Sequence, residues 1–300
     1  MNLSRTFVQF AGLCCIVISP LSAFAWGATG HMVVAHIGED NLTSAARVQV
    51  QDLLGSQTMA DVSSWADDER SRHREQAGWH YIDWELKDGA LLSGSSQNGT
   101  ILDAISSQSA ILENTAADKQ ERKKALMYVI HFLGDMHQPL HCADNFDKGG
   151  NGVNVTIFGQ GDNLHRTWDT TMLNQIIRDE FPTTSTSIRG FASIIEKRYA
   201  DEATTAVQGT PESWAKQSSL TAKNVCYSFL KSDPMTSMTV TLGPDYYTVA
   251  KPVVEEQLAI AGFRLAKVLN SILVGDGPTV ANEQTSVTST VPSGAAVGTN

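Results

Sequence analysis

Positive charge is scarce in this chain of 300 residues, which has 22 lysines and arginines against 32 aspartates and glutamates and a formal net charge of −10. Charged residues of both signs make up only 18% of the sequence, below the usual share of about 25%. Proteins that hold phosphate-bearing polymers through a basic surface need an excess of lysine and arginine. The composition therefore excludes long-range attraction to a polyanion as a source of affinity. Local positive charge would have to come from bound metal ions.

Long apolar runs are also missing, except near the start of the chain. Arg5 precedes an apolar run over residues 7–18, and Ala23-Phe24-Ala25 follows as a small-x-small pattern. This run is shorter than the roughly 20 residues that a membrane span needs, and the order of features is typical of a signal peptide. We expect residues 1–25 to be a signal peptide that is cleaved after Ala25. The mature protein would then be secreted or periplasmic, with no membrane anchor.

Cysteine is rare as well. Cys14 and Cys15 lie in the predicted signal peptide, so only Cys142 and Cys226 remain in the rest of the chain. An oxidising compartment favours disulfides, and we expect these two residues to pair. Two free, buried thiols are the alternative that the sequence leaves open.

Helical periodicity dominates the remaining sequence, and 42% of all residues are hydrophobic, enough for one sizeable core. The expected helical stretches are 30–54 (two helices, the second starting near residue 43), 101–114, 118–137, 164–178, 188–203, 211–230 and 246–273. Glycine and asparagine over residues 144–162, around the β-like run 153–158, predict a loop and a small hairpin. Residues 87–99 read as an exposed loop, and 275–300 as a flexible tail. The predicted fold is mainly α: one multi-helix domain over residues 26–274 with a small β-hairpin.

Histidine and aspartate recur at helical spacing in one part of the chain. His131 and Asp135 are four residues apart, so on a helix they share one face and can point at one metal ion. Pro139 ends or bends that helix, so that His141 can turn toward a second ion. Taken alone, the His131 and Asp135 pair could equally be a hydrogen-bonded pair on a helix face.

A second pair, His165 and Asp169, repeats the spacing of four. Together with His141 it gives two imidazoles and one carboxylate, a set typical of catalytic zinc with open positions for water. A surface ion pair on a helix turn is the alternative for this pair on its own.

Three further candidates lie upstream. Asp67 sits in Trp-Ala-Asp and His80 in His-Tyr-Ile-Asp, although an aspartate there could be a helix cap and a histidine beside aromatics could be a packed core residue. Cleavage at the predicted site would make Trp26 the first residue. Its free amino group and its carbonyl could then chelate a metal, and the glycines that follow would let the backbone fold back so that His31 joins. The alternative is an aromatic residue near a frayed end.

In their order along the chain, these residues resemble the single-strand-specific, trinuclear-zinc nucleases (type I nucleases), relatives of the bacterial zinc-dependent phospholipases C. The pattern is Trp-x4-His, Trp-Ala-Asp, His-Tyr-Ile-Asp, His-x3-Asp-x5-His and His-x3-Asp, and it extends from residue 26 to about residue 270. The resemblance implies a mainly helical fold with three zinc ions at the base of a cleft. It also implies their ligands: Asp67, His80, His131 and Asp135 for the first ion, His141, His165 and Asp169 for the second, and the amino group and carbonyl of Trp26 with His31 and Asp135 for the third.

The resemblance further implies an endonuclease that hydrolyses single-stranded DNA and RNA to 5′-phosphate products, acting as a monomer. Arg70, three residues after Asp67, would neutralise the phosphate in the transition state, although a surface arginine is the alternative. Tyr81, Asp83 and Asn151 would form a pocket for a base. A base enters such a pocket more cheaply from a single strand than from a duplex, because it must first unstack. Activity toward a 3′-phosphate of a nucleotide stays open.

Two other functions compete with this one. A zinc-dependent phospholipase C would use the same kind of cluster on a lipid head group, but those relatives place the first histidine farther from the N-terminal tryptophan and usually end the last ligand pair with glutamate. Here the spacing is Trp26-x4-His31, and the last candidate ligand is Asp169. An exported zinc-binding protein without catalysis is the alternative from another class. Storage of zinc would need neither open metal positions nor Arg70.

Overall fold

The protein is described by a computed structural model over residues 26–92, 98–181, 187–229 and 239–274. The predicted signal peptide 1–25, the predicted tail 275–300 and part of the predicted loop 87–99 lie outside the described residues. The α-helices are α1 (Ala28–Asp40), α2 (Ser44–Leu54), α3 (Met59–Val62), α4 (Trp65–Arg72), α5 (Ile101–Glu113), α6 (Lys119–Asp135), α7 (Leu164–Arg166), α8 (Met172–Glu180), α9 (Ile188–Arg198), α10 (Ala203–Ala206), α11 (Pro211–Thr221) and α12 (Pro244–Val274). The short 3₁₀ helices are η1 (Arg74–His80), η2 (Pro139–His141) and η4 (Ala200–Glu202), and the π-helical segments are η3 (Thr167–Thr171) and η5 (Ala222–Cys226).

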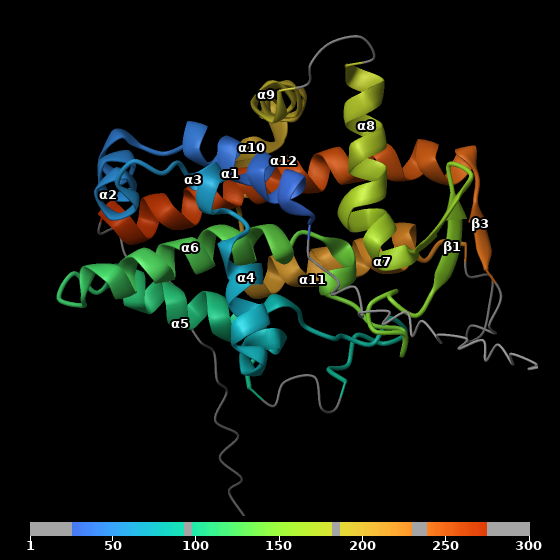
Figure 1. The fold of residues 1–300 in the computed structure, drawn as a ribbon, viewed down its shortest axis with the longest axis horizontal. Helices are drawn as coiled ribbons and strands as arrows, with labels where there is room; N and C mark the ends of the chain where they lie inside the picture. Colours follow the sequence, from blue (N-terminus) through green and yellow to red (C-terminus); the bar gives the residue numbers. More distant parts are fainter. Residues whose placement is uncertain (1–25, 93–97, 182–186, 230–238, 275–300) are drawn as a thin grey trace, which may run out of the picture.

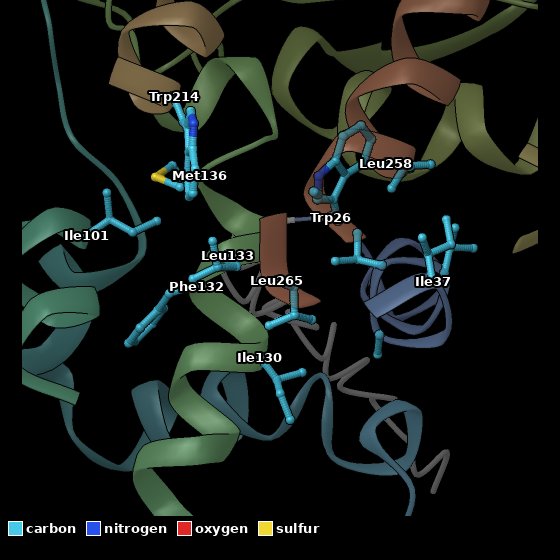
Figure 2. Packing of buried hydrophobic residues seen from close by; sticks show 14 of the residues in the cluster. Trp26, Ile37, Ile101, Ile130, Phe132, Leu133, Met136, Trp214, Leu258 and Leu265 are labelled. Carbon is cyan, nitrogen blue, oxygen red and sulfur yellow. The ribbon is translucent and has the colours of Figure 1, made fainter. Parts of the chain in front are cut away.

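The core is built around α12, against which α1 and α6 pack (Figure 1). Glycine permits the close approach of α1 and α12: a Cβ on Gly262 would lie 2.5 Å from the side chain of Ile37, and one on Gly38 would lie 2.8 Å from Leu265. Figure 2 shows Ile37, Leu258 and Leu265 gathered in this core, with the ring of Trp26 beside them. Interiors are packed to crystal density, so such contacts fix where α1 sits.

Helix α6 brings its C-terminal half into the interior. Asp118 caps its first turn by accepting from the backbone N–H groups of Gln120 and Glu121. From Ala125 to its end, every residue of α6 is buried, and Figure 2 shows Ile130, Phe132 and Leu133 in the core. A helix that is buried on all sides carries its polar residues into the interior as well. The candidate metal-binding residues of α6 are therefore removed from solvent.

The hairpin expected in the glycine-rich region is present and belongs to a slightly larger sheet. Strands β1 (Asn154–Ile157) and β2 (Gln160–Asn163) pair antiparallel through a turn at Phe158 and Gly159, both of which have positive φ. The strand β3 (Val240–Leu242) pairs parallel to β1 and completes the order β2-β1-β3. The sequence did not indicate β3, because a strand of three residues shows too little alternation to be recognised.

The long helices of the prediction are confirmed, with breaks that the periodicity did not show. The expected helix 188–203 ends at Arg198, and the expected helix 211–230 passes into η5 at Ala222. The expected helix 164–178 contains the π-helical segment η3. The short elements α3, α4 and η1 were not predicted, because helices of four to eight residues, one of them mostly charged, lack a clear apolar stripe.

The expected disulfide between Cys142 and Cys226 is not formed. Both thiols are free and buried, and the Cys142 sulfur donates to the backbone oxygen of Met136 at 3.3 Å. Burial raises the pKa of both thiols, which keeps them in the neutral form. The cysteines thus act as small core residues, the alternative that the sequence left open.

Helix α12 is longer and more apolar than we expected of any segment after the predicted signal peptide. By length and composition alone, this helix of 31 residues could cross a membrane, whereas we expected no such segment after residue 25. More than half of its most apolar stretch, 56%, is buried inside the protein. A core helix passes the same test, and the packing of α1 and α6 on α12 accounts for its apolar composition.

Candidate metal centre

His131 lies in the middle of the buried half of α6, with its ring held from behind. Its Nδ1 lies 2.7 Å from the backbone oxygen of Ser63, which precedes α4. This hydrogen bond places a proton on Nδ1 and turns Nε2 the opposite way. There, Nε2 lies 3.1 Å from Asp135 Oδ2 and 3.7 Å from Asp67 Oδ1. A histidine held by a backbone carbonyl in this manner is typical of a metal ligand.

Asp135 lies between three imidazole rings. His31 stacks on His131 with ring centroids 4.0 Å apart, and its Nε2 lies 3.1 Å from Asp135 Oδ1. His80, at the end of η1, places its Nδ1 2.9 Å from the other oxygen, Oδ2. The two oxygens of one carboxylate therefore face different rings. We call the five residues His31, Asp67, His80, His131 and Asp135 the merged group.

A glycine allows the rings of the merged group to come this close. A Cβ on Gly134 would lie 2.8 Å from Nδ1 of His31, which is shorter than any real contact of that kind. Because α1 and α6 touch here without a side chain between them, His31 can stack on His131.

His141, His165 and Asp169 form a second cluster, which we call the separate group. The two Nε2 atoms of the histidines lie 3.1 Å apart, and His165 Nε2 lies 3.5 Å from Asp169 Oδ2. Both rings are oriented by backbone carbonyls, since His141 Nδ1 lies 2.7 Å from the oxygen of His80 and His165 Nδ1 lies 2.6 Å from that of Gly149. Asp169 projects from the π-helical η3, and π-bulges occur frequently at functional sites.

Among the described residues, the ligand atoms fall into three sets that could each hold one cation. They are His31 with Asp67 and His131, His80 with His131 and Asp135, and His141 with His165 and Asp169, and within each set the atoms lie within 4.8 Å of one another. The third set is the one that the resemblance implies for the second zinc. The first two overlap within the merged group, with His31 close to both Asp67 and Asp135.

The merged group is strongly polarised. Burial alone would lower the pKa of His131, but the charges of Asp135 and Asp67 outweigh it and raise that pKa to about 9. Burial would likewise raise the pKa of Asp135, but His131 and the other two rings hold it well below its ordinary value. Burial lowers the pKa of His31 and of His80. Without a metal, His131 thus stays protonated and positively charged, and Asp135 stays negatively charged.

The separate group behaves in the opposite way. Burial, and then the neighbouring ring of His165, lowers the pKa of His141 to about 3. Burial lowers the pKa of His165 to about 4. Burial also raises the pKa of Asp169 well above its ordinary value. Both imidazoles are therefore neutral at physiological pH, the form in which their Nε2 lone pairs can bind a metal.

The buried polar atoms of the merged group fit a bound cation. Nδ1 of His31 and Oδ1 of Asp67 are buried without a hydrogen-bond partner, and His31 Nε2 and Asp135 Oδ1 face each other at 3.1 Å without a well-formed hydrogen bond. Unpaired buried polar atoms are costly and call for an explanation. Imidazole nitrogens combined with carboxylate oxygens are zinc ligands. The donor atoms present therefore suit zinc in chemistry and in spacing.

Trp26 is fully buried, so it is no aromatic at a frayed end. The N–H of Gly27 donates to the backbone oxygen of Asp169 at 2.9 Å, which ties this part of the chain to the separate group. A Cβ on Gly30 would lie 2.8 Å from that of Trp26, so a glycine is required where α1 turns past the ring. The segment that joins Trp26 to His31 of the merged group thus also touches the separate group, at Asp169.

Arg70 lies beside the merged group. Its Nη2 lies 3.5 Å from Asp67 Oδ1, and its side chain is 16% exposed. Burial is the main reason for the lowered pKa values of His80 and His165, and the charge of Arg70 adds to the effect in each case. An arginine that contacts the merged group, is sensed electrostatically by the separate group and retains some contact with water can meet a bound anion.

The residues predicted to contact a base lie on two segments, and among the described residues the structure records no contact between Asn151 and the other two. Tyr81 and Asp83 follow His80, and this stretch hydrogen-bonds to the segment 141–144 through Ile82 N to the oxygen of His141, at 2.8 Å. Burial, and then the nearby charge of Asp144, raises the pKa of Asp83 to about 7. The side chain of Asn151 donates to the backbone oxygen of Lys148, so its amide is engaged within its own loop.

Four contacts that orient the candidate ligands were not predicted from the sequence. The backbone oxygens of Ser63, His80 and Gly149 hold three of the rings, and the side chain of Gln138 hydrogen-bonds to Asp169. Backbone acceptors leave no trace in the sequence. For Gln138, the available signal was its place between Asp135 and His141, in a turn with ligands on both sides.

Known proteins resemble this chain over most of its length. The chain matches the family model described as S1/P1 nuclease over residues 26–274. It is similar to nuclease PA3 of a Penicillium species and to nuclease P1 of Penicillium citrinum, each 31% identical over 269 residues that cover 82% of this chain and 97% of the relative. It is also similar to endonuclease 2 of Arabidopsis thaliana, 28% identical over 272 residues that cover 82% of this chain and 90% of the relative.

Proposed function

Because this chain belongs to the S1/P1 nuclease family, we propose that it is a zinc-dependent endonuclease that hydrolyses single-stranded DNA and RNA to 5′-phosphate products. The chain is a nuclease by family, and the proposal adds the metal, the strand preference and the product. We further propose that it holds three zinc ions and acts as a monomer.

One observation supports the proposal most strongly. Eight buried side chains from elements spread between α1 and η3 form two adjoining groups, and backbone carbonyls fix the tautomer of a histidine in each group. A core that served only stability would not collect five rings and three carboxylates with unpaired atoms. The merged group would hold two of the three ions, and the separate group would hold one.

The residues of this chain divide the work. Bound zinc would supply a Lewis acid and lower the pKa of bound water to about 7. Asp135 presents one oxygen to each side of the merged group and so keeps two cation positions close together. Arg70 would pair with a phosphate oxygen, which suits its planar fork of N–H donors. The buried surroundings strengthen each of these interactions, since they exclude water.

The preference for single strands follows from the pocket proposed beside the groups. The ring of Tyr81 would stack on a base, Asp83 would accept from base N–H groups, and Asn151 would complete the pocket. A base must leave its stack to reach them, which costs a few kcal/mol in a duplex and little in a single strand. The acidic character of the chain makes this stacking and the bound cations more important, because a basic surface is lacking.

We propose that export completes the site. Cleavage after Ala25 would free the amino group of Trp26, whose neighbour Gly27 hydrogen-bonds to the backbone oxygen of Asp169. That amine and the Trp26 carbonyl would then join His31 and Asp135 around one ion. N-terminal sequencing of the mature protein tests this step, and a mature chain that begins elsewhere would contradict it.

The activity test compares substrates and metals together. Purified protein is assayed on single-stranded DNA, single-stranded RNA, duplex DNA and phosphatidylcholine, before and after treatment with a chelator. We expect cleavage of both single strands, slower cleavage of the duplex, and loss of activity on chelation with recovery on adding zinc. Faster turnover of phosphatidylcholine would favour a phospholipase. Bound zinc without turnover on any phosphodiester would favour a storage protein.

A further inference from the structure

The turn between α6 and η2 contains a fully buried glutamine that the proposed chemistry does not yet use. Gln138 lies between Asp135 and His141, one candidate ligand from each group. Its Oε1 accepts from the backbone N–H of Leu140 at 2.6 Å, and its Nε2 donates to Oδ1 of Asp169. The side chain therefore joins its own turn to a candidate ligand 31 residues further along the chain.

The orientation of this amide follows from its partners. A backbone N–H can only donate, so the atom of Gln138 that faces Leu140 is the oxygen, and the NH₂ group is left for Asp169. The backbone of the turn is held as well: the N–H of Gln138 donates to the backbone oxygen of Asp135 at 3.0 Å, and the backbone oxygen of Gln138 accepts from His141 N at 2.9 Å. Both the backbone of Gln138 and its side-chain amide are therefore fixed by hydrogen bonds.

This contact makes the two oxygens of Asp169 unequal. Oδ1 is taken by Gln138, whereas Oδ2 lies 3.5 Å from His165 Nε2 and belongs to the separate group. A carboxylate with both oxygens free can bind a cation through the two together. With one oxygen held by an amide, only the other is presented to the cation.

We propose that Gln138 is a positioning residue that makes Asp169 a monodentate ligand through Oδ2, and so keeps one coordination position open in the separate group. The inference rests on the proposed function, because it requires a zinc ion between His141, His165 and Asp169. Three protein ligands leave the fourth place of a tetrahedral zinc site free, whereas a bidentate carboxylate would fill that place. Gln138 thereby reserves the position for an oxygen of the substrate.

The first test replaces the amide without changing the length of the side chain. Gln138→Met removes the donor, and Gln108→Met, at a buried glutamine of α5, is the matched control. We expect Gln138→Met to weaken one of the bound zinc ions by about 10- to 100-fold, the usual effect of losing a partner of a ligand, and to leave the other ions unchanged. With cobalt in place of zinc, the visible absorption should fall, because a bidentate Asp169 raises the coordination number.

A double variant identifies the ion concerned. If Gln138 acts through Asp169, adding Gln138→Met to Asp169→Asn should cause no further loss of metal affinity. Wild-type metal affinities and an unchanged cobalt spectrum in Gln138→Met would overturn the inference, and so would fully additive losses in the double variant. A wild-type protein that holds no tightly bound zinc would instead refute the proposed function.

The second test needs no variant, so it stands even where Gln138→Met fails to fold. A crystal structure of the zinc-loaded wild-type protein should show Asp169 bound to zinc through Oδ2 alone, with Oδ1 on the amide of Gln138. An Asp169 bound through both oxygens, or a Gln138 amide turned away from it, would overturn the inference.

Discussion

The merged group and the separate group use the same residue types in opposite electrostatic states. In the merged group, carboxylates outweigh burial and raise the pKa of His131 to about 9. In the separate group, burial prevails and lowers the pKa values of His141 and His165 to about 3 and about 4. The difference comes from the carboxylates: Asp135 contacts three rings directly and keeps its charge, whereas burial raises the pKa of Asp169 well above its ordinary value and disfavours its charged form.

This contrast indicates how each group would treat a cation. The carboxylates of the merged group keep a proton on His131 when no metal is bound. A cation that binds there would displace that proton. The separate group has neutral rings with their lone pairs already exposed, so it would bind a cation without first losing a proton from a histidine. Two positions in one group and one in the other are the simplest division of three ions.

The largest expected effect is that of Asp135→Asn, which removes the carboxylate that the merged group shares. We expect the loss of two of the three proposed zinc ions and a fall in turnover of more than about 100-fold, since even an indirect partner of a ligand costs about 10- to 100-fold. Zinc analysis and cleavage of single-stranded DNA measure both. Asp52→Asn, at an exposed aspartate paired with Lys119, is the control. Three zinc ions in Asp135→Asn would contradict the assignment of Asp135.

His165→Ala should affect the separate group alone. We expect one zinc ion to be lost and the two in the merged group to remain, because His165 hydrogen-bonds only to the loop at Gly149 and to its own group. Turnover should fall by about 100-fold or more, again judged from the cost of losing an indirect partner. His73→Ala, at a half-exposed histidine, should retain all three ions. Loss of every ion in His165→Ala would show that the groups are not separate in their metal binding.

Gly134→Ala should disturb only the merged group, and more mildly. The added Cβ would lie 2.8 Å from His31 Nδ1, so the ring or α1 must shift, at a cost of about 1–3 kcal/mol in stability. Metal affinity should fall at the position that His31 serves, and the separate group should keep its ion. Gly161→Ala is the control, because a Cβ there meets no atom within 4 Å. Equal melting temperatures and metal affinities in the two variants would show that His31 can move away from the added Cβ without loss of stability or of metal binding.

The two groups also differ in how many of their candidate ligands could be paired from sequence spacing alone. His131 and Asp135 could be paired from their spacing, because both lie on one continuous helix whose cap and apolar residues are local signals. His165 and Asp169 could be paired in the same way, although η3 is π-helical rather than α-helical. His31, Asp67 and His80 come from separate elements, so their convergence on Asp135 required the resemblance to a family.

The remaining features depend on tertiary contacts that carry no sequence pattern. The strand β3 exists because three residues meet β1 from a distant segment. The expected disulfide followed from compartment and cysteine count, which say nothing of whether two thiols are placed to bond. The proposed role of Gln138 in positioning Asp169 depends on the fold placing the Asp169 carboxylate against the Gln138 amide. In each case, the information lies in the packing of elements far apart in the chain.

The smallest expected effect is on the stability of the metal-free protein as a function of pH, where the two groups should act with opposite sign. His131 has its pKa raised from 6.5 to about 9, so its contribution is complete below pH 6.5 and is lost as the pH rises toward 9. His141 and His165 have pKa values lowered from 6.5 to about 3 and about 4, so the unfolded chain binds more protons between those values and 6.5. Their effect is a stability that increases as the pH rises to 6.5.

Urea unfolding of the chelated protein at constant ionic strength separates these contributions. His131→Asn should flatten the decline between pH 6.5 and 9, and His165→Asn should flatten part of the rise below pH 6.5, each leaving the other limb in place. The limbs are distinct because carboxylates outweigh burial at His131 and burial outweighs every opposing influence at His165. A decline above pH 6.5 that persists in His131→Asn would mean that the proton is held elsewhere, and the electrostatic contrast between the groups would then have another origin.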